Sequence, residues 1–150
     1  MTPAVEAARK AGIEFSLHEY AGVYVDEGDY AVAVARALDR EPAQLFKTLV
    51  ASVGGSLRVF VVPADRQLDL RAAGKRAQLA DRTLAERTTG YVAGGISPLG
   101  QRKRLPTTID ESALGWETIL VSAGRRGLQL ELRPEDLVAL TDGKVAAIAA

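Results

Sequence analysis

The chain has 150 residues and a mass of 15.9 kDa, and 47% of its residues are hydrophobic and 25% charged, which is typical of one globular domain and excludes general disorder. Nineteen Lys and Arg balance nineteen Asp and Glu, so a uniformly basic nucleic-acid-binding coat is excluded, although a local basic patch is not. The chain has no cysteine and one histidine, His18. This excludes disulfides, zinc–thiolate sites, iron–sulfur clusters and a thiol nucleophile, and it leaves little room for a His-based metal site or a catalytic triad.

Targeting and linker signals are missing from the sequence. The first residues lack the basic start and apolar stretch of a signal peptide, and no segment approaches the ~18 uninterrupted apolar residues of a membrane helix. No repeat or low-complexity linker divides the chain. We therefore expect a cytoplasmic protein in which residues 1–150 form one domain.

Helix and strand signals alternate in the first part of the chain. Thr2, Pro3 and Gly12 bracket a short helix, and the alternation over 13–18 is typical of a half-buried strand. The next expected elements are a loop over 20–28, an Ala-rich helix over 29–38, strands over 45–53 and 57–62 joined by Gly54-Gly55-Ser56, and helices over 70–79 and 82–88 that follow the N-caps Asp69 and Asp81.

The second part of the chain contains hairpin signals and one more helix. Residues 90–100 are predicted as a strand stub that runs into a glycine-rich loop. Further strands are expected over 107–109, 117–122 and 128–132, with a turn at 124–127 and a final helix from Pro134. Hairpins mixed with helices predict a mixed sheet flanked by helices rather than a doubly wound repeat.

The glycine-rich loop is the first candidate site. From Gly95 it follows the spacing of a phosphate-binding P-loop, but Gln101 replaces the lysine and Pro106 prevents the helix that should follow. A nucleoside triphosphatase is therefore excluded. Gly94 and Gly95 would let a ligand approach the backbone and meet free N–H groups, unless the two glycines merely form a bend.

Lys47 is the second candidate, because it shares a predicted strand face with apolar residues. Its ammonium group either reaches the edge of the sheet or faces a cavity that holds an anion. The basic runs 102–104 and 125–126 indicate either solvated surface or a local phosphate contact. His18 is expected to be a partly exposed structural residue. Neither Ser97 nor Ser122 has a second histidine for a serine-hydrolase triad.

Several segments together carry a family resemblance. They are Met1–Ala4, Phe15–Tyr20, Phe46-Lys47-Thr48-Leu49, Thr89–Arg104 with its Gly-Gly-Ile-Ser-Pro core, Glu117–Gly127 and Pro134–Leu137. In this order they span the chain, which closely resembles the YbaK family, a relative of the editing domain inserted in bacterial prolyl-tRNA synthetases. The resemblance implies an α+β domain with a mixed, partly barrel-like sheet surrounded by helices.

The resemblance also implies an activity. The protein would be a free-standing trans-editing aminoacyl-tRNA deacylase that clears cysteine from the proline tRNA and also accepts cysteinyl-tRNA for cysteine. In such chemistry the substrate thiol attacks its own ester and forms a thiolactone, so the reaction is a lyase-type cyclisation rather than ester hydrolysis. No cofactor or metal is implied. The expected partners are the acceptor end of aminoacyl-tRNA and prolyl-tRNA synthetase, without membrane or DNA.

Site residues follow from the resemblance as well. It implies catalytic roles for Lys47, Gly94 and Ser122. The substrate-binding residues implied with them are Tyr20, Tyr30, Thr48, Gly95, Ile96, Ser97, Pro98 and Gly124. The Tyr30 match requires a one-residue insertion, and Ala123-Gly124 replaces the Gly-Gly that many relatives have there.

Two other functions are compatible with the sequence. One is a deacylase that uses water to clear alanyl- or another mischarged tRNA, and the other is a non-catalytic module that binds an acceptor end or a synthetase. Because a neutral chain gains little from counterion release, we expect weak binding of tRNA alone and recruitment by the synthetase.

Overall fold

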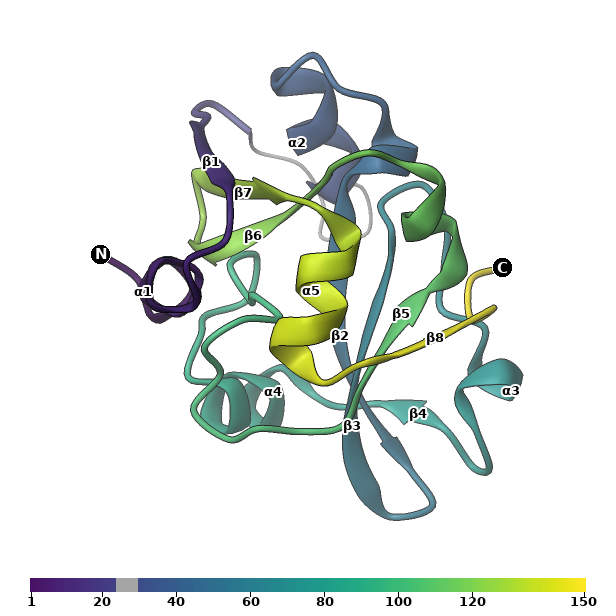
Figure 1. The fold of residues 1–150 in the computed structure, drawn as a ribbon. Coiled ribbons are helices and arrows are strands. Elements are labelled where there is room, and N and C mark those ends of the chain that lie inside the picture. The colour runs from purple at the N-terminus through teal and green to yellow at the C-terminus, as the bar shows by residue number, and fades with distance from the viewer. Residues whose placement is uncertain (24–29) are drawn as a thin grey trace.

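The computed structural model describes residues 1–23 and 30–150, which form two sheets with helices packed around them (Figure 1). The α-helices are α1 (Pro3–Ala11), α2 (Tyr30–Ala37), α3 (Leu70–Ala73), α4 (Arg82–Thr89) and α5 (Pro134–Thr141), and two 3-10 turns cover Pro42–Gln44 and Glu111–Gly115. The strands are β1 (Phe15–Glu19), β2 (Phe46–Val53), β3 (Ser56–Pro63), β4 (Gln78–Leu79), β5 (Thr107–Asp110), β6 (Ile119–Arg125), β7 (Leu128–Leu132) and β8 (Lys144–Ala146).

The helices α1, α3 and α4 begin where their capping residues predict. The Thr2 side chain accepts a hydrogen bond from the Val5 N–H, and Gly12 ends α1 in the left-handed conformation with a φ of 71°. The carboxylates of Asp69 and Asp81 accept hydrogen bonds from the first turns of α3 and α4. None of the helices in the described ranges is long and apolar enough to cross a membrane.

The strands form one antiparallel and one mixed sheet. The three-stranded sheet has the order β1-β7-β6, and the five-stranded sheet has the order β4-β2-β3-β5-β8, in which β5 runs parallel to both β3 and β8. A parallel bridge between Leu45 and Leu120 connects the two sheets. The α+β class is therefore confirmed, with two linked sheets that do not close into a barrel.

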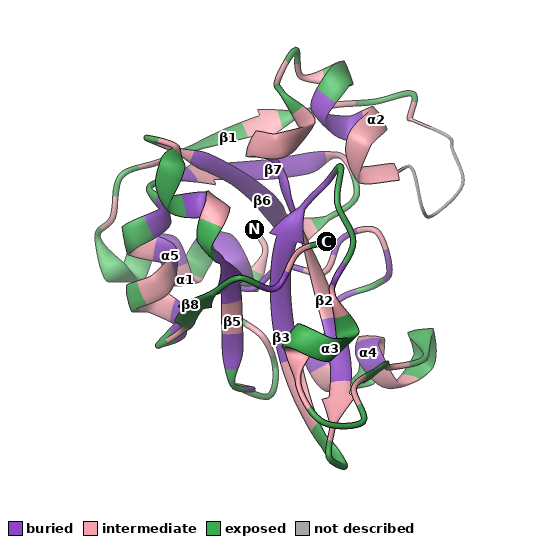
Figure 2. Ribbon diagram, turned by 90° about the vertical axis from the view of Figure 1, so that its right-hand side faces the viewer, coloured by how far each residue is buried: buried purple, intermediate pink, exposed green. Residues whose placement is uncertain are grey.

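The main core lies between the two sheets (Figure 2). Phe46, Val59 and Val61 of the larger sheet pack with Val121 and Leu130 of the smaller one, and all five are nearly inaccessible to solvent. The opposite face of the larger sheet buries a smaller cluster of Ala51, Phe60, Val62, Leu68 and Ile148. Consecutive residues of β2 thus face two separate apolar clusters, and this alternation determines how the site is built.

Three elements differ from the sequence-based expectation. The helix predicted over 70–79 ends at Ala73, because Gly74 leaves the helical conformation and residues 78–79 instead pair with β2 as β4. Residues 90–100 form a loop without a strand. Strand β8 was not predicted, since its pairing with β5 depends on contacts distant in sequence. The loop expected over 20–28 and the helix start at Asp29 fall mainly outside the described residues.

Hydrogen bonds to the Glu131 carboxylate attach the segment after α2 to the smaller sheet. Arg40, just after α2, donates two hydrogen bonds of 2.9 Å to the two carboxylate oxygens of Glu131 on β7. The His18 Nε2 atom lies 2.8 Å from the same carboxylate, and the Thr118 hydroxyl donates to it as well. His18 is therefore a partly buried structural residue, as expected. The bonds from Arg40, with smaller contributions from Thr118 and His18, lower the pKa of Glu131 to about 2 against the effect of burial.

We expect Glu131→Gln to lower the free energy of unfolding at pH 7 by about 2 kcal/mol, because Arg40 loses a charged partner in a partly buried site. Since the folded-state pKa lies below the ordinary value of 4.5, the carboxylate stabilises the fold above that pH. The stabilisation is lost as the pH falls toward about 2. Urea titrations between pH 2.5 and 7 measure this, with exposed Glu135→Gln as the control. An unchanged pH dependence in the Glu131 variant would contradict the assignment.

Candidate functional site

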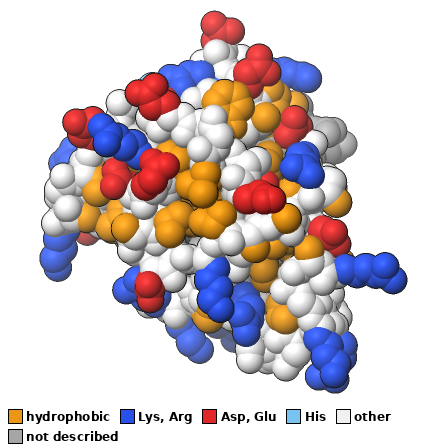
Figure 3. Space-filling model, turned by 45° about the vertical axis from the view of Figure 1, so that its right-hand side comes forward, with side chains coloured by type: hydrophobic (Ala, Val, Ile, Leu, Met, Phe, Trp, Pro, Cys, Tyr) orange, Lys and Arg blue, Asp and Glu red, His pale blue; other side chains and the backbone are white. Residues whose placement is uncertain are grey.

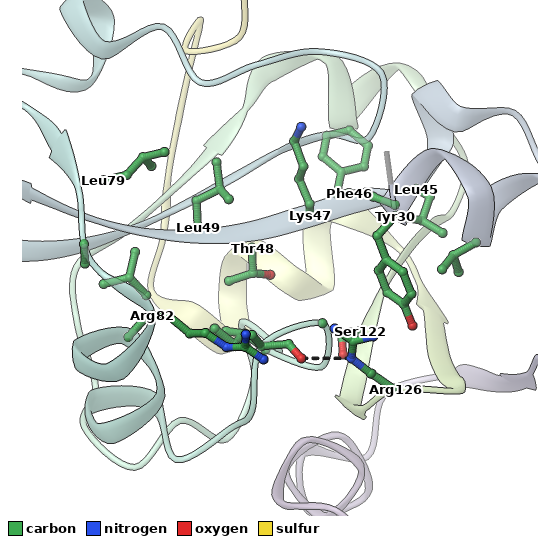
Figure 4. Close-up of a pocket in the computed structure, with 18 of the residues that line it drawn as sticks. Tyr30, Leu45, Phe46, Lys47, Thr48, Leu49, Leu79, Arg82, Ser122 and Arg126 are labelled. Atoms are coloured by element: carbon green, nitrogen blue, oxygen red, sulfur yellow. Dashed lines mark hydrogen bonds between the residues drawn. The ribbon is translucent and has the colours of Figure 1, made fainter. Parts of the chain in front are cut away.

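A cavity of about 590 Å³ lies beside β2, between α2, the start of α4, the loop after α4 and the β6–β7 hairpin (Figure 4). It opens along an edge of β2 that has few strand partners. The Leu45 carbonyl accepts from the Ala64 N–H on the β3 side, whereas the Val50 carbonyl accepts from the Ala80 N–H on the opposite side. Backbone groups of alternate residues in a strand point to the same side, and Thr48 lies two residues before Val50. The Thr48 N–H and carbonyl therefore point away from β3, toward the cavity edge.

Lys47 and Thr48 line the cavity from opposite faces of β2. In Figure 4 the Lys47 side chain points away from the side on which Thr48, Ser122 and Arg126 lie. Lys47 is half-buried, and desolvation lowers the pKa of its ammonium group, opposed by the charge of Asp65. An ammonium group placed in this way is suited to hold an anionic group that enters along the strand edge.

Gly94 gives the cavity a bare stretch of backbone. Its φ is 84°, and a Cβ at this position would lie 2.7 Å from the Arg126 Cζ atom. The Gly94 N–H donates to no described group, whereas the Gly95 N–H is used in a turn with the Val92 carbonyl at 2.9 Å. One of the two adjacent glycines therefore offers a donor to a ligand, and the other forms the bend.

Ser122 on β6 contributes a hydroxyl to the same cavity. It is 9% exposed, and its Oγ accepts a hydrogen bond of 3.1 Å from the Gly124 N–H. Its own proton is then free to be donated to a ligand oxygen. Gln129 is the cross-strand partner of Ser122 and lines the cavity too. His18, the histidine of the chain, is engaged with Glu131 and is not among the lining residues, so it is not a base for Ser122.

Two tyrosines and an arginine form one end of the cavity. The Tyr20 and Tyr30 hydroxyls are 2.9 Å apart, and the Arg126 Cζ lies 4.8 Å from the centre of the Tyr30 ring. Burial and the hydrogen bond with Tyr20 raise the pKa of Tyr30, so its hydroxyl stays protonated at neutral pH. Tyr30 lines the cavity directly, and Tyr20 contacts Tyr30 through the bond between the two hydroxyls.

The other residues implied by the resemblance divide into two groups. Thr48 and Ile96 line the cavity together with Lys47, Gly94, Ser122 and Tyr30. Gly95, Ser97, Pro98, Gly124 and Tyr20 lie outside its lining. Ser97 is fully buried, and its hydroxyl accepts from the Leu99 N–H, so it shapes the loop. Gly124 acts through the Ser122 hydroxyl.

Four polar lining residues were not singled out as site residues from sequence. Gln67, Arg82 and Gln129 carry no recognisable motif, and Arg126 was noted only as half of a basic pair. The charged lining residues in the described ranges are Lys47, Arg82 and Arg126, and no carboxylate is among them. In a chain of zero net charge, an all-cationic cavity favours an anionic ligand. No cluster of metal-ligating side chains occurs in the part of the chain that the structure describes.

The fold and the cavity define an α+β domain with a cationic cavity at a sheet edge and hydrogen-bond donors at the cavity floor. The family model for the aminoacyl-tRNA editing domain matches residues 26–140, so the chain belongs to that family. This confirms the family resemblance found in the sequence.

A relative agrees with this membership, and two solved structures share the fold. The chain is 39% identical over 137 residues to a protein of Enterococcus faecalis named "Putative Cys-tRNA(Pro)/Cys-tRNA(Cys) deacylase EbsC", covering 87% of this chain and 83% of that one. A solved structure described as "a putative trans-editing enzyme for prolyl tRNA synthetase" superposes with a TM-score of 0.81 at 24% identity, covering 100% and 99% of the two chains. A hypothetical protein superposes with a TM-score of 0.87, also at 24% identity, with 99% of each chain covered.

Proposed function

We propose that this protein is a trans-editing aminoacyl-tRNA deacylase that removes cysteine from the proline tRNA and from the cysteine tRNA. One observation carries the proposal. The cavity combines cations with the Gly94 N–H and the Ser122 hydroxyl, and the described lining holds no carboxylate or histidine that would serve as a general base. Such a site is suited to hold the tRNA phosphate beside the aminoacyl ester and to stabilise a developing oxyanion, but it depends on the substrate for the nucleophile.

The cysteinyl ester supplies that nucleophile. A thiol with a pKa near 8.5 is a few per cent ionised at neutral pH, and the resulting thiolate attacks the carbonyl carbon of its own ester. The sulfur–carbon bond forms as the ester carbon–oxygen bond breaks, and the ribose oxygen takes up the proton that the thiol released to solvent. The products are a thiolactone and free tRNA. Holding the ester in a reactive conformation contributes several kcal/mol by orientation.

Charge segregation in the chain supports a tRNA substrate. Residues 54–104 contain ten Lys and Arg but four Asp and Glu, a difference of six, and the rest of the chain carries the compensating negative charge. These basic residues lie on neighbouring segments, because the Gly54 N–H bonds the Lys75 carbonyl and the Arg102 N–H bonds the Thr89 carbonyl. Figure 3 shows many Lys and Arg side chains on the lower part of one face. This end of the molecule is suited to the phosphates of an acceptor stem.

The same segregation bears on partners. Zero net charge alone predicts weak binding of tRNA, whereas a basic end permits local phosphate contacts at low salt. We propose that prolyl-tRNA synthetase still aids recruitment at physiological salt. Tight binding of free tRNA by the isolated protein at that salt concentration would contradict this.

A deacylation panel tests the proposed function. Cysteinyl-, alanyl-, seryl- and prolyl-tRNA are each incubated with the protein, and the amino-acid products are identified. We expect rapid loss of cysteine from both tRNAs and a thiolactone as the first product. Free cysteine without thiolactone would indicate attack by water, preferential loss of alanine would indicate a different substrate, and binding without cleavage would indicate a non-catalytic module.

We expect Lys47→Ala to lower kcat/KM for cysteinyl-tRNA by about 10-fold or more, because a charge-assisted contact to an anionic or carbonyl oxygen of the substrate is lost. Folding is expected to survive, since Lys47 has no ion-pair partner within 4.0 Å among the described residues. Lys47→Arg restores activity only partly, because a planar fork replaces a compact charge. Exposed Lys144→Ala is the control. A folded Lys47→Ala protein with wild-type activity would remove Lys47 from the site.

A further inference from the structure

Two arginines at the cavity rim are connected through Ala93, Arg126 directly and Arg82 by way of Glu86. Arg82 begins α4, and Arg126 lies in the turn between β6 and β7. The Ala93 carbonyl accepts a hydrogen bond of 3.1 Å from the Arg126 Nε atom. The Ala93 N–H donates to the Glu86 carboxylate at 2.6 Å, and the same carboxylate lies 3.6 Å from the Arg82 Nε. Figure 4 shows both guanidinium groups on the Thr48 side of β2, opposite the Lys47 side chain.

The Arg126 guanidinium is held on two sides. Its Cζ lies 4.8 Å from the centre of the Tyr30 ring, and its Nη2 would lie 2.8 Å from a Cβ at Gly94. The missing side chain of Gly94 therefore makes room for this group. Nε is used by the Ala93 carbonyl, and neither Nη atom bonds a residue in the described ranges. A planar group fixed through Nε keeps its two terminal nitrogens available for a bidentate contact.

The two arginines differ in their charge partners within the chain. The Arg82–Glu86 pair is largely exposed, so it contributes little to folding. Glu86 compensates part of the Arg82 charge, whereas Arg126 has no carboxylate partner among the described residues. The described lining of the cavity holds no carboxylate either. An anionic ligand would supply the partner that Arg126 lacks, and the fork geometry of arginine matches a phosphate well.

We propose that Arg82 and Arg126 form a clamp for the phosphate that joins the terminal adenosine to the rest of the tRNA. The identity of the ligand rests on the proposed function, whereas the preference for a phosphate rests on the two arginines. The clamp places the ribose next to Gly94 and Ser122, so the ester reaches the donors at the cavity floor. Lys47, on the other face of β2, is left to contact a different group of the substrate.

Two substrates that differ in this phosphate test the clamp. Cysteinyl-tRNA contains it, and 3′-O-cysteinyl-adenosine lacks it. We expect Arg126→Gln and Arg82→Gln each to lower kcat/KM for cysteinyl-tRNA by about 10-fold, as for loss of a charge-assisted bond, and to change it less than about 2-fold for the nucleoside ester. Arg126→Lys restores only part of the loss. The controls are Arg125→Gln in the same turn and Arg87→Gln in α4, neither of which lines the cavity.

Calorimetric binding gives a readout that does not need activity. Wild-type protein is expected to bind adenosine 5′-monophosphate at least about 10-fold more tightly than adenosine, and the double Gln variant should lose this preference. Equal losses on the two substrates would overturn the clamp and show that the arginines act through the shape of the Gly94 loop. No preference for the monophosphate in the wild type would overturn it as well. A preserved preference in a protein that cleaves no cysteinyl ester would refute the proposed function and support the clamp.

Discussion

Gly94→Ala should lower kcat/KM for cysteinyl-tRNA by about 100-fold while leaving the protein folded. The added Cβ would lie within 3 Å of the Arg126 guanidinium, and the φ of 84° disfavours any side chain. The guanidinium is displaced, and the ester is held away from the Gly94 N–H. Misplacement of a reacting group by about 1 Å is enough for a loss of this size. Steady-state kinetics and circular dichroism of the purified variant measure the two parts of the prediction.

Gly55→Ala is the matched control for backbone strain. Gly55 has a φ of 88° in the β2–β3 turn, but a Cβ there meets nothing within 4 Å. It should cost about 1–2 kcal/mol in stability, as expected for a left-handed backbone, and leave kcat/KM unchanged. If both variants lose stability equally and keep full activity, Gly94 is only a bend in the chain and the proposed role of its N–H is wrong.

Replacement of the substrate thiol is expected to have the largest effect. Seryl-tRNA of the same tRNA should be cleaved about 10³-fold more slowly than cysteinyl-tRNA, because a hydroxyl requires a general base and such a base contributes about 10² to 10⁴-fold. The described cavity lining offers no carboxylate or histidine for this role. A pocket that distinguished the two by fit alone would separate such similar side chains only weakly.

An S-methylated cysteinyl ester separates nucleophilicity from recognition. It retains the sulfur but has no ionisable thiol, so it should resist cleavage and inhibit competitively. Its slow cleavage with free S-methylcysteine as the product would mean that water attacks the ester. Equal rates for cysteinyl and seryl esters would contradict substrate-assisted attack outright.

Local signals in the sequence were sufficient for most of the secondary structure. Thr2, Asp69 and Asp81 are capping residues whose side chains bond the following turn, so the helix starts are visible without tertiary contacts. The Gly54-Gly55 turn likewise positions the β2–β3 hairpin. The helix over 70–79 was overestimated because a two-residue strand, β4, is stabilised by its partner β2 and not by its own sequence.

For the candidate site too, some features were visible in the sequence and others required the tertiary structure. The amino-acid sequence by itself determined the balanced charge, the lack of cysteine, the α+β class and the segments that carry the family resemblance, because these depend on residue identity and short-range order. Only the tertiary structure decided that Lys47 and Thr48 line the cavity from opposite faces of β2 and that Ser97 is buried away from it. It also decided that Arg82 and Arg126 line one cavity, with Arg126 bonded to Ala93 and Arg82 connected to it by way of Glu86. The physical reason is that elements distant in sequence form the cavity. Where it opens along β2 depends on how much of that strand edge lacks a neighbouring strand.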